Sequence, residues 1–417
     1  MSRVLFTIAF AVAILVSVSL HELGHLVSAK RFGMRVTRFF VGYGPTVFSW
    51  RRGETEYGLK AIPLGGFCTI AGMTPDDDEI DPKTPSPGPA HRAMWRFPVW
   101  KRTVVMVSGV TVQFALAVAG LWFATAFVGV PNLAYPQTAE QLGAQPAAIV
   151  LADCVTPDAA RACVPGDPVS PALAAGLRDG DVLTAVDGVA IATYADMVRV
   201  IREARPGLTE VAYVRDGQPA TVRADLSAVQ RPPLSDPTAA PTTVAALGVG
   251  LHVTAPREVT FGPAGAFGAT VTYTGWMAGQ TWEAAKRIPE KVPALWRSIT
   301  GEERDPQTPI SVVGVSILGG EAASLGMWST VLMIFIGLNV FMVFFNLLPL
   351  LPLDGGHIAI AWFERARSWA ATRLGRPDPG RVDYLKLMPL TYAVVLIGGA
   401  FTLLTITADV VNPITIR

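Results

Sequence analysis

Two histidines and a glutamate lie inside an apolar run near the start of the sequence, in the order His21-Glu22-Leu23-Gly24-His25. On a helix, residues four apart lie one turn apart on the same face, so both imidazoles can reach one metal ion. Glu22 is rotated off that face, where it can contact a metal-bound water instead of the metal. The pattern predicts a zinc hydrolase with His21 and His25 as ligands and Glu22 as the general base.

The HExxH pattern alone is weak evidence, because it also occurs by chance on helices of soluble proteins. Here it lies within residues 4–29, an apolar run long enough to cross a bilayer. Two imidazoles and a carboxylate left unpaired in hydrocarbon would cost several kcal/mol, and a divalent cation compensates them directly. The apolar surroundings therefore favour a metal site over a surface feature.

A third metal ligand is expected from Asp354, which follows Pro349-Leu350-Leu351-Pro352-Leu353 at the end of another apolar segment. The prolines break a helix at membrane depth, and irregular backbone is tolerated there only when it is buried in protein or lines a wet cavity. Three protein ligands with one open position are typical of catalytic zinc. His357 either contacts one of the metal ligands without binding the metal itself, or it is a helix-capping or solvent-facing histidine.

The composition indicates a membrane protein. Of the 417 residues, 51% are hydrophobic and 16% are charged, whereas soluble domains carry about 25% charged residues. The net charge of +1 gives no indication of a nucleic-acid partner. Three cysteines are too few for a zinc site of four thiolates or for a disulfide-dense scaffold.

We expect a polytopic α-helical membrane protein with four transmembrane helices. Basic residues at the ends of the first two apolar runs place residues 33–102 in the cytoplasm, and therefore both termini outside. The segment after Asp354 is also basic, so Asp354 and the HExxH motif are expected on the same side. The predicted spans are residues 1–32 with HExxH, 103–130, 327–356 with the Leu353-Asp354-Gly355 motif, and 387–410.

Within the cytoplasmic segment, Thr55–Gly72 alternates weakly and carries aromatic and branched residues, so strand hairpins are predicted there. Gly65 and Gly66 would allow close backbone approach. One interpretation is an ordinary cytoplasmic hairpin. The other is a sheet edge that pairs with an extended substrate peptide along Gly65, Gly66 and Phe67.

The region from residue 131 to 257 is polar and is expected outside the membrane. It contains a small mixed α/β module, with predicted strands at 182–186, 209–214 and 218–226 and a helix at 196–204. Cys154 and Cys163 precede this module. In an oxidising compartment they could form a disulfide that closes a short loop, and two unpaired thiols are the alternative.

Residues 258–326 are expected to form extracytoplasmic interfacial helices and a re-entrant segment. Phe261–Trp282 is only weakly apolar, and the tryptophans and basic residues in and after it suit a helix at the membrane surface. A spanning segment over Phe261–Trp282 is the less favoured alternative.

The HELGH motif, the LDG motif after Asn346-Leu347-Leu348-Pro349 and the stretch GLRDGDVLTAVDG together resemble the site-2 protease family of intramembrane zinc metalloproteases. The resemblance covers nearly the whole chain and is closest to the actinobacterial, mycobacterial-type branch. It implies one catalytic Zn²⁺ held by His21, His25 and Asp354, with Glu22 as base. It also implies that Asn346 holds the substrate backbone, that Tyr57–Cys68 belongs to a membrane-associated β-hairpin loop on the cytoplasmic side, and that residues 141–228 form an extracytoplasmic PDZ domain.

One departure from the family pattern lies at residues 108–113. Many relatives have Gly-Pro there and asparagine at the position of Gln113. Because Gln113 can still form hydrogen bonds, the difference bears on helix packing rather than on activity.

The sequence therefore predicts an intramembrane zinc metalloprotease that hydrolyses peptide bonds within the transmembrane segment of single-span membrane proteins. The resemblance implies regulated intramembrane proteolysis of substrates such as anti-sigma factors, pre-cleaved by a site-1 protease, in a bacterial plasma membrane. A metal transporter and a catalytically silent scaffold are the alternatives. A transporter rarely needs a glutamate beside a ligand in HExxH spacing, and a silent scaffold typically lacks one of the four key residues.

Overall fold

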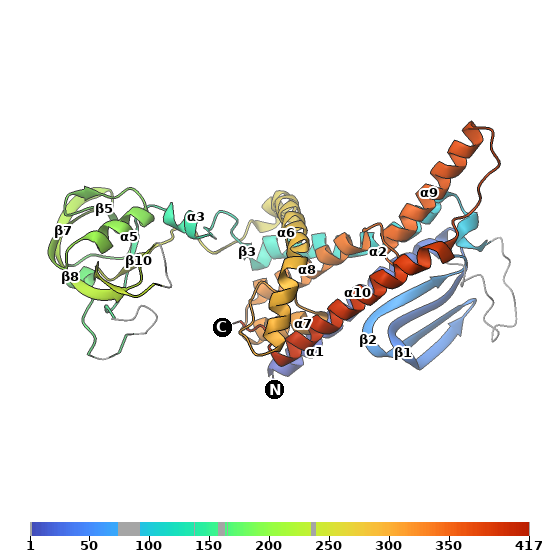
Figure 1. Cartoon of the computed structure of the whole chain (residues 1–417), viewed down its shortest axis with the longest axis horizontal. Helices are drawn as coiled ribbons and strands as arrows, with labels where there is room; N and C mark the ends of the chain where they lie inside the picture. The colour runs from blue at the N-terminus through green and yellow to red at the C-terminus, as the bar shows by residue number, and fades with distance from the viewer. Residues whose placement is uncertain are drawn as a thin grey trace. The chain divides into compact units, whose positions relative to one another are not determined.

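The computed structural model describes residues 2–73, 92–136, 138–156, 163–164, 166–234 and 239–416. The chain divides into two compact units, the first made of residues 1–130 and 260–417 and the second of residues 131–259. The first unit is a helix bundle with one β-sheet, and the second is mainly β-structure (Figure 1).

Four helices of the first unit are long and apolar enough to cross a membrane, which confirms the predicted number of apolar spans. In hydrocarbon a chain must satisfy its own backbone hydrogen bonds, and an apolar helix does so within one segment. The predicted start of the second helix was residue 103, but the observed helix begins earlier, at Val99, and it ends in a π-helical turn. The four are α1 (Ser2–Arg31), α2 (Val99–Phe123) with its π-helical extension η4 (Ala124–Val128), α8 (Trp328–Asn346) and α10 (Tyr384–Val411).

The third spanning helix is shorter than the predicted range 327–356. Helix α8 ends at Asn346, and a new helix, α9 (Asp354–Arg373), begins at the expected metal ligand. Pro349 and Pro352 account for the break, because proline lacks the backbone N–H and clashes with the preceding turn of a helix. Asp354 therefore lies in the first turn of α9 instead of within the spanning helix.

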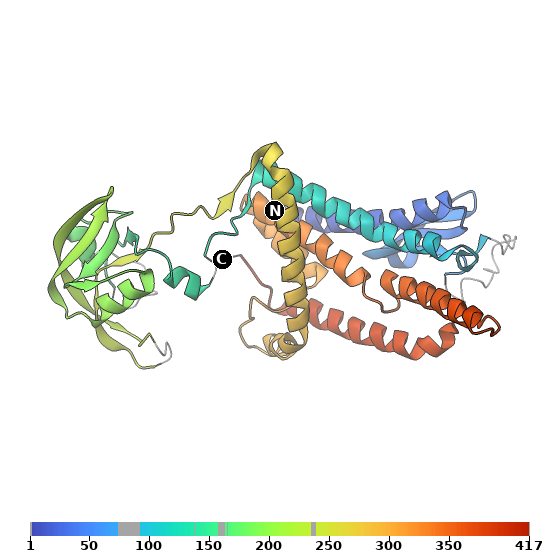
Figure 2. The ribbon, with the colours of Figure 1, turned by 90° about the horizontal axis from the view of Figure 1, so that it is seen from above.

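Two further helices complete the bundle, α6 (Gly262–Ile299) and α7 (Val312–Ser324). Helix α6 lies across the ends of the spanning helices (Figure 2). Helix α7 packs on α1 at two glycines, since a Cβ atom at Gly319 or Gly320 would overlap Phe10 or Thr7. The small residues allow the two backbones to approach closely, as in other membrane helix pairs.

The sheet of the first unit consists of two long, bent strands, β1 (Val36–Arg52) and β2 (Thr55–Ile70), which are antiparallel. Phe40 of β1 pairs with Phe67 on one side and with Gly58 on the other, so the first half of β1 lies between the two halves of β2. The C-terminal half of β2 is therefore an edge of the curved sheet. The prediction of strand hairpins within Thr55–Gly72 was wrong in one respect, because this range forms the single strand β2, whose partner β1 was not predicted.

The second unit is built on a five-stranded antiparallel sheet in the order β6-β5-β7-β8-β9. Helix α5 (Tyr194–Glu203) begins at a capping box between Thr193 and Asp196 and buries its apolar face in the core. The strands of the sheet are β5 (Val182–Val186), β6 (Val189–Ala190), β7 (Gly207–Arg215), β8 (Gln218–Arg231) and β9 (Thr242–Ala246). The remaining short elements are η3 (Met94–Arg96), β3 (Val130–Pro131), α3 (Ala139–Gly143), β4 (Ile149–Leu151), α4 (Pro171–Ala174), β10 (Val249–Leu251) and β11 (Glu258–Val259).

The predicted elements of this module coincide with observed ones. The strands expected at 182–186, 209–214 and 218–226 are found as β5, β7 and β8, and the helix expected at 196–204 is α5. Asp216, in the turn that joins β7 to β8, adopts a positive φ of 51°. Cys154 and Cys163 form a disulfide, and Cys68 is a free thiol.

Candidate metal centre

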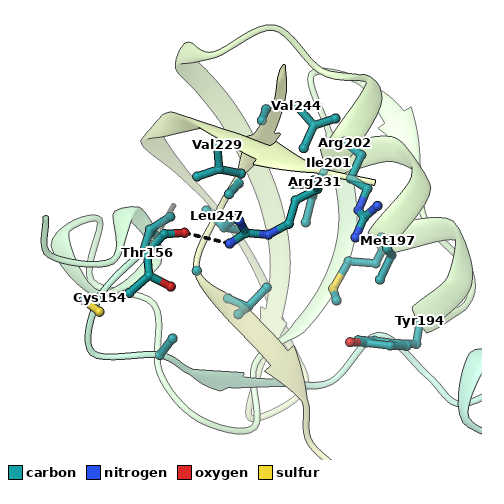
Figure 3. Close-up of a pocket in the computed structure, with 17 residues that line it drawn as sticks. Cys154, Thr156, Tyr194, Met197, Ile201, Arg202, Val229, Arg231, Val244 and Leu247 are labelled. Carbon is teal, nitrogen blue, oxygen red and sulfur yellow. Dashed lines mark hydrogen bonds between the residues drawn. The ribbon is translucent and has the colours of Figure 1, made fainter. Parts of the chain in front are cut away.

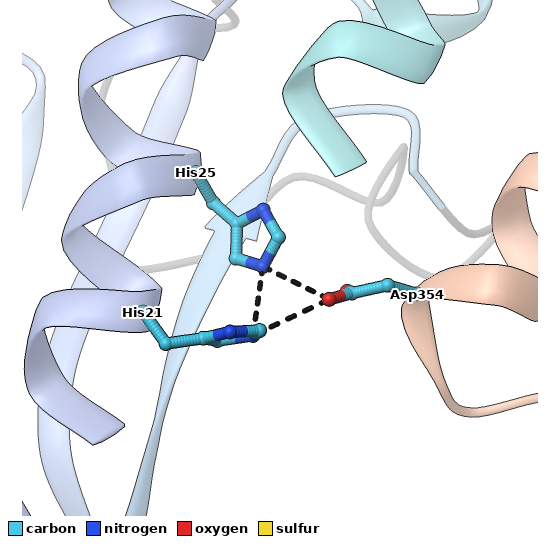
Figure 4. Close-up of side chains that lie close together, drawn as sticks. All are labelled: His21, His25 and Asp354. Carbon is cyan, nitrogen blue, oxygen red and sulfur yellow. Dashed lines mark hydrogen bonds and ion pairs between the residues drawn. The ribbon is translucent and has the colours of Figure 1, made fainter. Parts of the chain in front are cut away.

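The structure brings the three predicted metal ligands together. His21 and His25 come from consecutive turns of α1, and Asp354 approaches them from the first turn of α9 (Figure 4). The Nε2 atoms of the two histidines are 3.1 Å apart. Oδ2 of Asp354 lies 3.3 Å from Nε2 of His21 and 3.4 Å from Nε2 of His25. Both histidines are buried, so this cluster lies inside the bundle.

These distances suit a single tetrahedral metal ion. Bonds of about 2.0–2.1 Å at tetrahedral angles place ligand atoms roughly 3.3–3.4 Å from one another. Oδ2 of Asp354 is buried and has no hydrogen-bond partner among the described residues, which is costly for a carboxylate unless a cation lies beside it. The cluster can therefore hold a metal ion, and its two nitrogens and one oxygen are ligands that zinc accepts.

Helix α2 fixes the orientation of one histidine. Nδ1 of His25 lies 2.8 Å from the carbonyl oxygen of Val105, and a carbonyl can only accept, so Nδ1 carries the proton. The lone pair of His25 is then on Nε2, the atom that points toward His21 and Asp354. Val105 thus prepares His25 to bind a metal, a role that the sequence gave no means of finding.

Two glycines let α1 and α2 approach at this level. A Cβ atom at Gly24 would lie 2.7 Å from the carbonyl oxygen of Ser108, and a Cβ atom at Gly109 would collide with both histidine rings. The hydroxyl groups of Ser28 and Ser108 are 2.8 Å apart, which adds a polar contact between the helices. The glycine within the HExxH motif was the one available signal for this close packing.

Glu22 lies between the metal-binding cluster and the edge of the sheet. The backbone of Cys68 on β2 hydrogen-bonds to the Glu22 carboxylate. A Cβ atom at Gly66 would lie 3.4 Å from Cγ of Glu22, so β2 passes the carboxylate at a residue without a side chain. The strand edge therefore lies in direct contact with Glu22, beside the metal-binding cluster.

Two ionisable side chains on the sheet stay neutral beside Glu22. Burial raises the pKa of the Cys68 thiol, and the negative charge of Glu22 raises it further. The pKa of Tyr43 is raised by the same two causes, and its hydroxyl donates to the carbonyl oxygen of Gly66 over 2.9 Å. Neither group therefore competes with Glu22 as a base at neutral pH.

The other predicted residues come from α8, β2, α2 and α9. Asn346 is the last residue of α8, half-buried, and its amide has no hydrogen bond among the described residues. Phe67 stacks on Phe40, with ring centroids 5.5 Å apart, so it is held by the sheet. Gln113 is fully buried and donates to Sδ of Met342 over 3.2 Å, which links α2 to α8. His357 is buried one turn after Asp354.

A separate groove lies in the second unit, between α5 and the chain around β9 and β10. It encloses about 340 Å³, and its walls include Met197 and Ile201 of α5 together with Val244 and Leu247 (Figure 3). Arg231 reaches across the groove and donates to the carbonyl oxygen of Thr156 over 2.8 Å. A helix and a strand that flank a groove can accommodate an extended peptide.

Comparison with known proteins identifies the class to which this site belongs. The model of peptidase family M50 matches residues 9–374, a range that includes all three predicted ligands and Glu22. The chain therefore belongs to peptidase family M50, the site-2 protease family, and is a zinc metalloprotease. This membership favours a protease over the transporter and silent-scaffold alternatives.

Particular relatives extend over nearly the entire chain. Zinc metalloprotease Rip1 of Mycobacterium bovis is 42% identical over 414 residues, which cover 98% of this chain and 97% of the relative. Rip1 of Mycolicibacterium smegmatis is 40% identical over 419 residues, 98% of each chain. A putative zinc metalloprotease of Mesorhizobium japonicum is 28% identical over 361 residues, 84% of this chain and 86% of the relative. The chain is thus a multi-pass membrane protease that is similar to Rip1.

Proposed function

We propose that the protein hydrolyses peptide bonds within the transmembrane segment of single-span membrane proteins, and that its substrates are anti-sigma factors already trimmed by a site-1 protease. The observation that carries this proposal is the buried cluster of His21, His25 and Asp354, in which both histidines, like Glu22 beside them, come from a helix long enough to span a membrane. Ionisable groups at that depth are expensive and serve a function by default.

The chemistry follows from the positions of four side chains. His21, His25 and Asp354 would hold a zinc ion, which when bound lowers the pKa of a water and stabilises negative charge on a carbonyl oxygen. Glu22 takes the proton from the attacking water and later delivers it to the leaving amine. Burial of the cluster excludes bulk water and strengthens these electrostatic interactions.

The substrate must be extended before it can react, because a helix engages its carbonyls in backbone hydrogen bonds. The edge of β2 at Gly65, Gly66 and Phe67 runs close to Glu22, and pairing of a peptide with this edge would hold the peptide extended. Asn346, whose amide is uncommitted, would donate to a substrate carbonyl. Together these groups would place the scissile bond beside Glu22.

The proposed arrangement in the plasma membrane of a bacterium follows the distribution of basic residues. Residues 33–102, which contain the sheet, would lie on the cytoplasmic side, and both termini would lie outside. Helix α6 would lie at the outer membrane surface. The second unit would be an extracytoplasmic PDZ domain, and its groove would bind the new C-terminus of a trimmed substrate or exclude untrimmed ones.

The test is cleavage of a tagged single-span anti-sigma factor by purified wild-type protein and by Glu22→Gln, with bound zinc quantified in both. Cleavage by wild type alone, with zinc retained in Glu22→Gln, is expected if Glu22 is the base. The exposed Glu210 provides a matched control, because Glu210→Gln is the same substitution at a position in the second unit. This variant should cleave the substrate as wild type does. Equal cleavage by wild type and Glu22→Gln would contradict the assignment.

The role of the second unit is tested by removing residues 131–259 and comparing trimmed with untrimmed substrate. A filter predicts that the shortened protein cleaves both, whereas wild type cleaves only the trimmed form. Unchanged selectivity would rule the filter out.

A further inference from the structure

One face of α9 consists of alternating tryptophan and arginine side chains. Trp362, Arg365, Trp369 and Arg373 follow one another at helical spacing, so they lie on one side of the helix, and all four are exposed. The guanidinium of Arg373 lies 4.9 Å from the centre of the Trp369 ring. We call these four residues the α9 stripe. Large aromatic side chains exposed in a row mark an interaction surface.

The opposite face of α9 fixes the direction in which the stripe points. Glu364 is buried and accepts a hydrogen bond of 3.0 Å from Arg102 of α2. Its other oxygen accepts the backbone N–H of Val382 over 2.9 Å. Both contacts hold the buried face of α9 against the bundle. Trp362, at the start of the stripe, also donates from Nε1 to the hydroxyl of Thr103 on α2 over 3.0 Å, whereas the rest of the stripe is exposed.

The same two contacts define the depth of the stripe in the membrane. Arg102 directly precedes the apolar part of α2, and Val382 precedes α10 by two residues. Glu364 therefore lies at the level where two spanning helices leave the hydrocarbon. Arg365 is one residue further, and Arg373 is roughly 12 Å beyond it along the axis. Since the headgroup layer is about 5–8 Å thick on each side, an α9 inclined to the bilayer would place the whole stripe against headgroups.

The charge of this region suits an anionic partner. Residues 355–386 contain six basic and three acidic side chains, a net charge of +3. One of the three acids, Glu364, is already paired with Arg102. Within the part of the chain that the structure describes, neither Arg365 nor Arg373 has a carboxylate within 4.0 Å. Alternating tryptophan and arginine at a membrane surface is typical of helices that bind anionic lipid.

The stripe is rigidly connected to the metal centre, because α9 begins at Asp354. Gly355 and Gly356 pack on the backbone of residues 347–351 so closely that a Cβ atom at either would overlap it. A cavity of about 250 Å³, lined by Ile360, Phe363 and Leu387 among others, separates this part of α9 from α10. A displacement of α9 would therefore also displace Asp354.

We propose that the α9 stripe binds the headgroups of anionic phospholipids and that this contact holds Asp354 in place beside His21 and His25. The lipid contact does not depend on the proposed function. Its effect on cleavage rests on that function, so the two parts are tested by separate measurements.

The first measurement is the lipid retained by purified full-length protein, determined by native mass spectrometry after exposure to mixed phosphatidylglycerol and phosphatidylcholine. Wild type should retain phosphatidylglycerol preferentially. The double variant Arg365→Gln/Arg373→Gln should lower this preference, by roughly thirty-fold at low ionic strength if both arginines contact headgroups. Arg365→Lys/Arg373→Lys should keep most of it. Equal preference in the glutamine variant and wild type overturns the proposal.

Arg205→Gln/Arg223→Gln is the matched control, because it removes the same charge from exposed positions of the second unit. It should retain phosphatidylglycerol as wild type does. A similar loss in this control would show that net charge, and not the stripe, sets the preference, and would also overturn the proposal.

The second measurement is cleavage in vesicles of phosphatidylcholine alone or with phosphatidylglycerol. Wild type and the control should cleave faster in the anionic vesicles, and Arg365→Gln/Arg373→Gln should lose this difference. The same lipid dependence in all variants would contradict the link to Asp354. Retained lipid preference with no cleavage in any vesicle would contradict the proposed function and support the lipid contact alone.

Discussion

Gly109 of α2 lies directly against His25 of α1, so closely that a Cβ atom at Gly109 would be 2.5 Å from Nε2 of His25. Real Cβ atoms do not approach other atoms to that distance, and the same Cβ would lie 2.8 Å from Cε1 of His21. The metal-binding cluster thus requires glycine on the neighbouring helix. This requirement concerns the two imidazoles themselves, not merely the fit of two helices.

Gly109→Ala is therefore expected to displace both histidines and to abolish zinc binding together with cleavage. The measurement is the zinc content of the purified protein, followed by thermal unfolding. Gly398→Ala is the matched control, because Gly398 also lies within a spanning helix and a Cβ atom there would have no neighbour within 4 Å. Normal zinc content in Gly109→Ala would show that α2 yields easily and that the close approach has no consequence.

Gly66→Ala should impair substrate binding while zinc stays bound. A Cβ atom at Gly66 would lie 2.9 Å from the carbonyl oxygen of Phe40 and would shift the strand edge beside Glu22 by a few tenths of an ångström. Misplacement of a substrate by about 1 Å can cost roughly a hundred-fold in rate, so we expect a loss of about ten-fold in kcat/KM. Ser49→Ala, on the other edge of the sheet, should have no effect.

The zinc content of purified Gly66→Ala shows whether the substitution acts on the metal centre or on the strand edge. Loss of zinc from Gly66→Ala would place the effect on the metal centre instead of on the strand edge. Unchanged kcat/KM would show that no peptide pairs at Gly66.

The metal centre was predictable from the sequence because residue types and local spacing determine it. His21 and His25 share a helical face whatever surrounds them, and the prolines before Asp354 predict the break at which it lies. Strand β1 was missed because its residues do not alternate and because it bends at Gly42 and Gly44, where φ is 86° and 83°. Val105 and Gly109 act through contacts between α1 and α2, which no local pattern contains.

The second unit offers a test of its disulfide. Cys154 and Cys163 are separated by 9 residues, and closing so short a loop is worth about 2–3 kcal/mol on the chain-entropy model. Cys154→Ala/Cys163→Ala should lower the free energy of unfolding by that amount, measured by denaturant titration of full-length protein with a probe in this unit. Reductant should lower the stability of wild type and leave the double variant unchanged. A response of the double variant to reductant would show that the effect arises elsewhere.

Asp181 of the same unit is expected to make folding stability depend on pH. It is 2% exposed and accepts hydrogen bonds from Nε and Nη2 of Arg215 over 2.8 and 2.7 Å. Burial alone would raise the pKa of Asp181, but the hydrogen bonds from Arg215 and from the backbone of Arg178 outweigh it and hold that pKa below its usual range. The ionised form is therefore favoured in the folded state.

A carboxyl group with a lowered pKa in the folded state stabilises the fold at every pH above its unfolded pKa of about 4, and this stabilisation is lost as the pH falls through the folded pKa. The free energy of unfolding of residues 131–259 should thus be nearly constant from pH 7 to about 5 and should fall below pH 4. Asp181→Asn should be less stable at pH 7, since Arg215 loses its charged partner, and should show a weaker decline in acid. The exposed Asp225 provides the control, because Asp225→Asn should decline as wild type does. An equally steep decline in Asp181→Asn would show that another group causes the acid sensitivity.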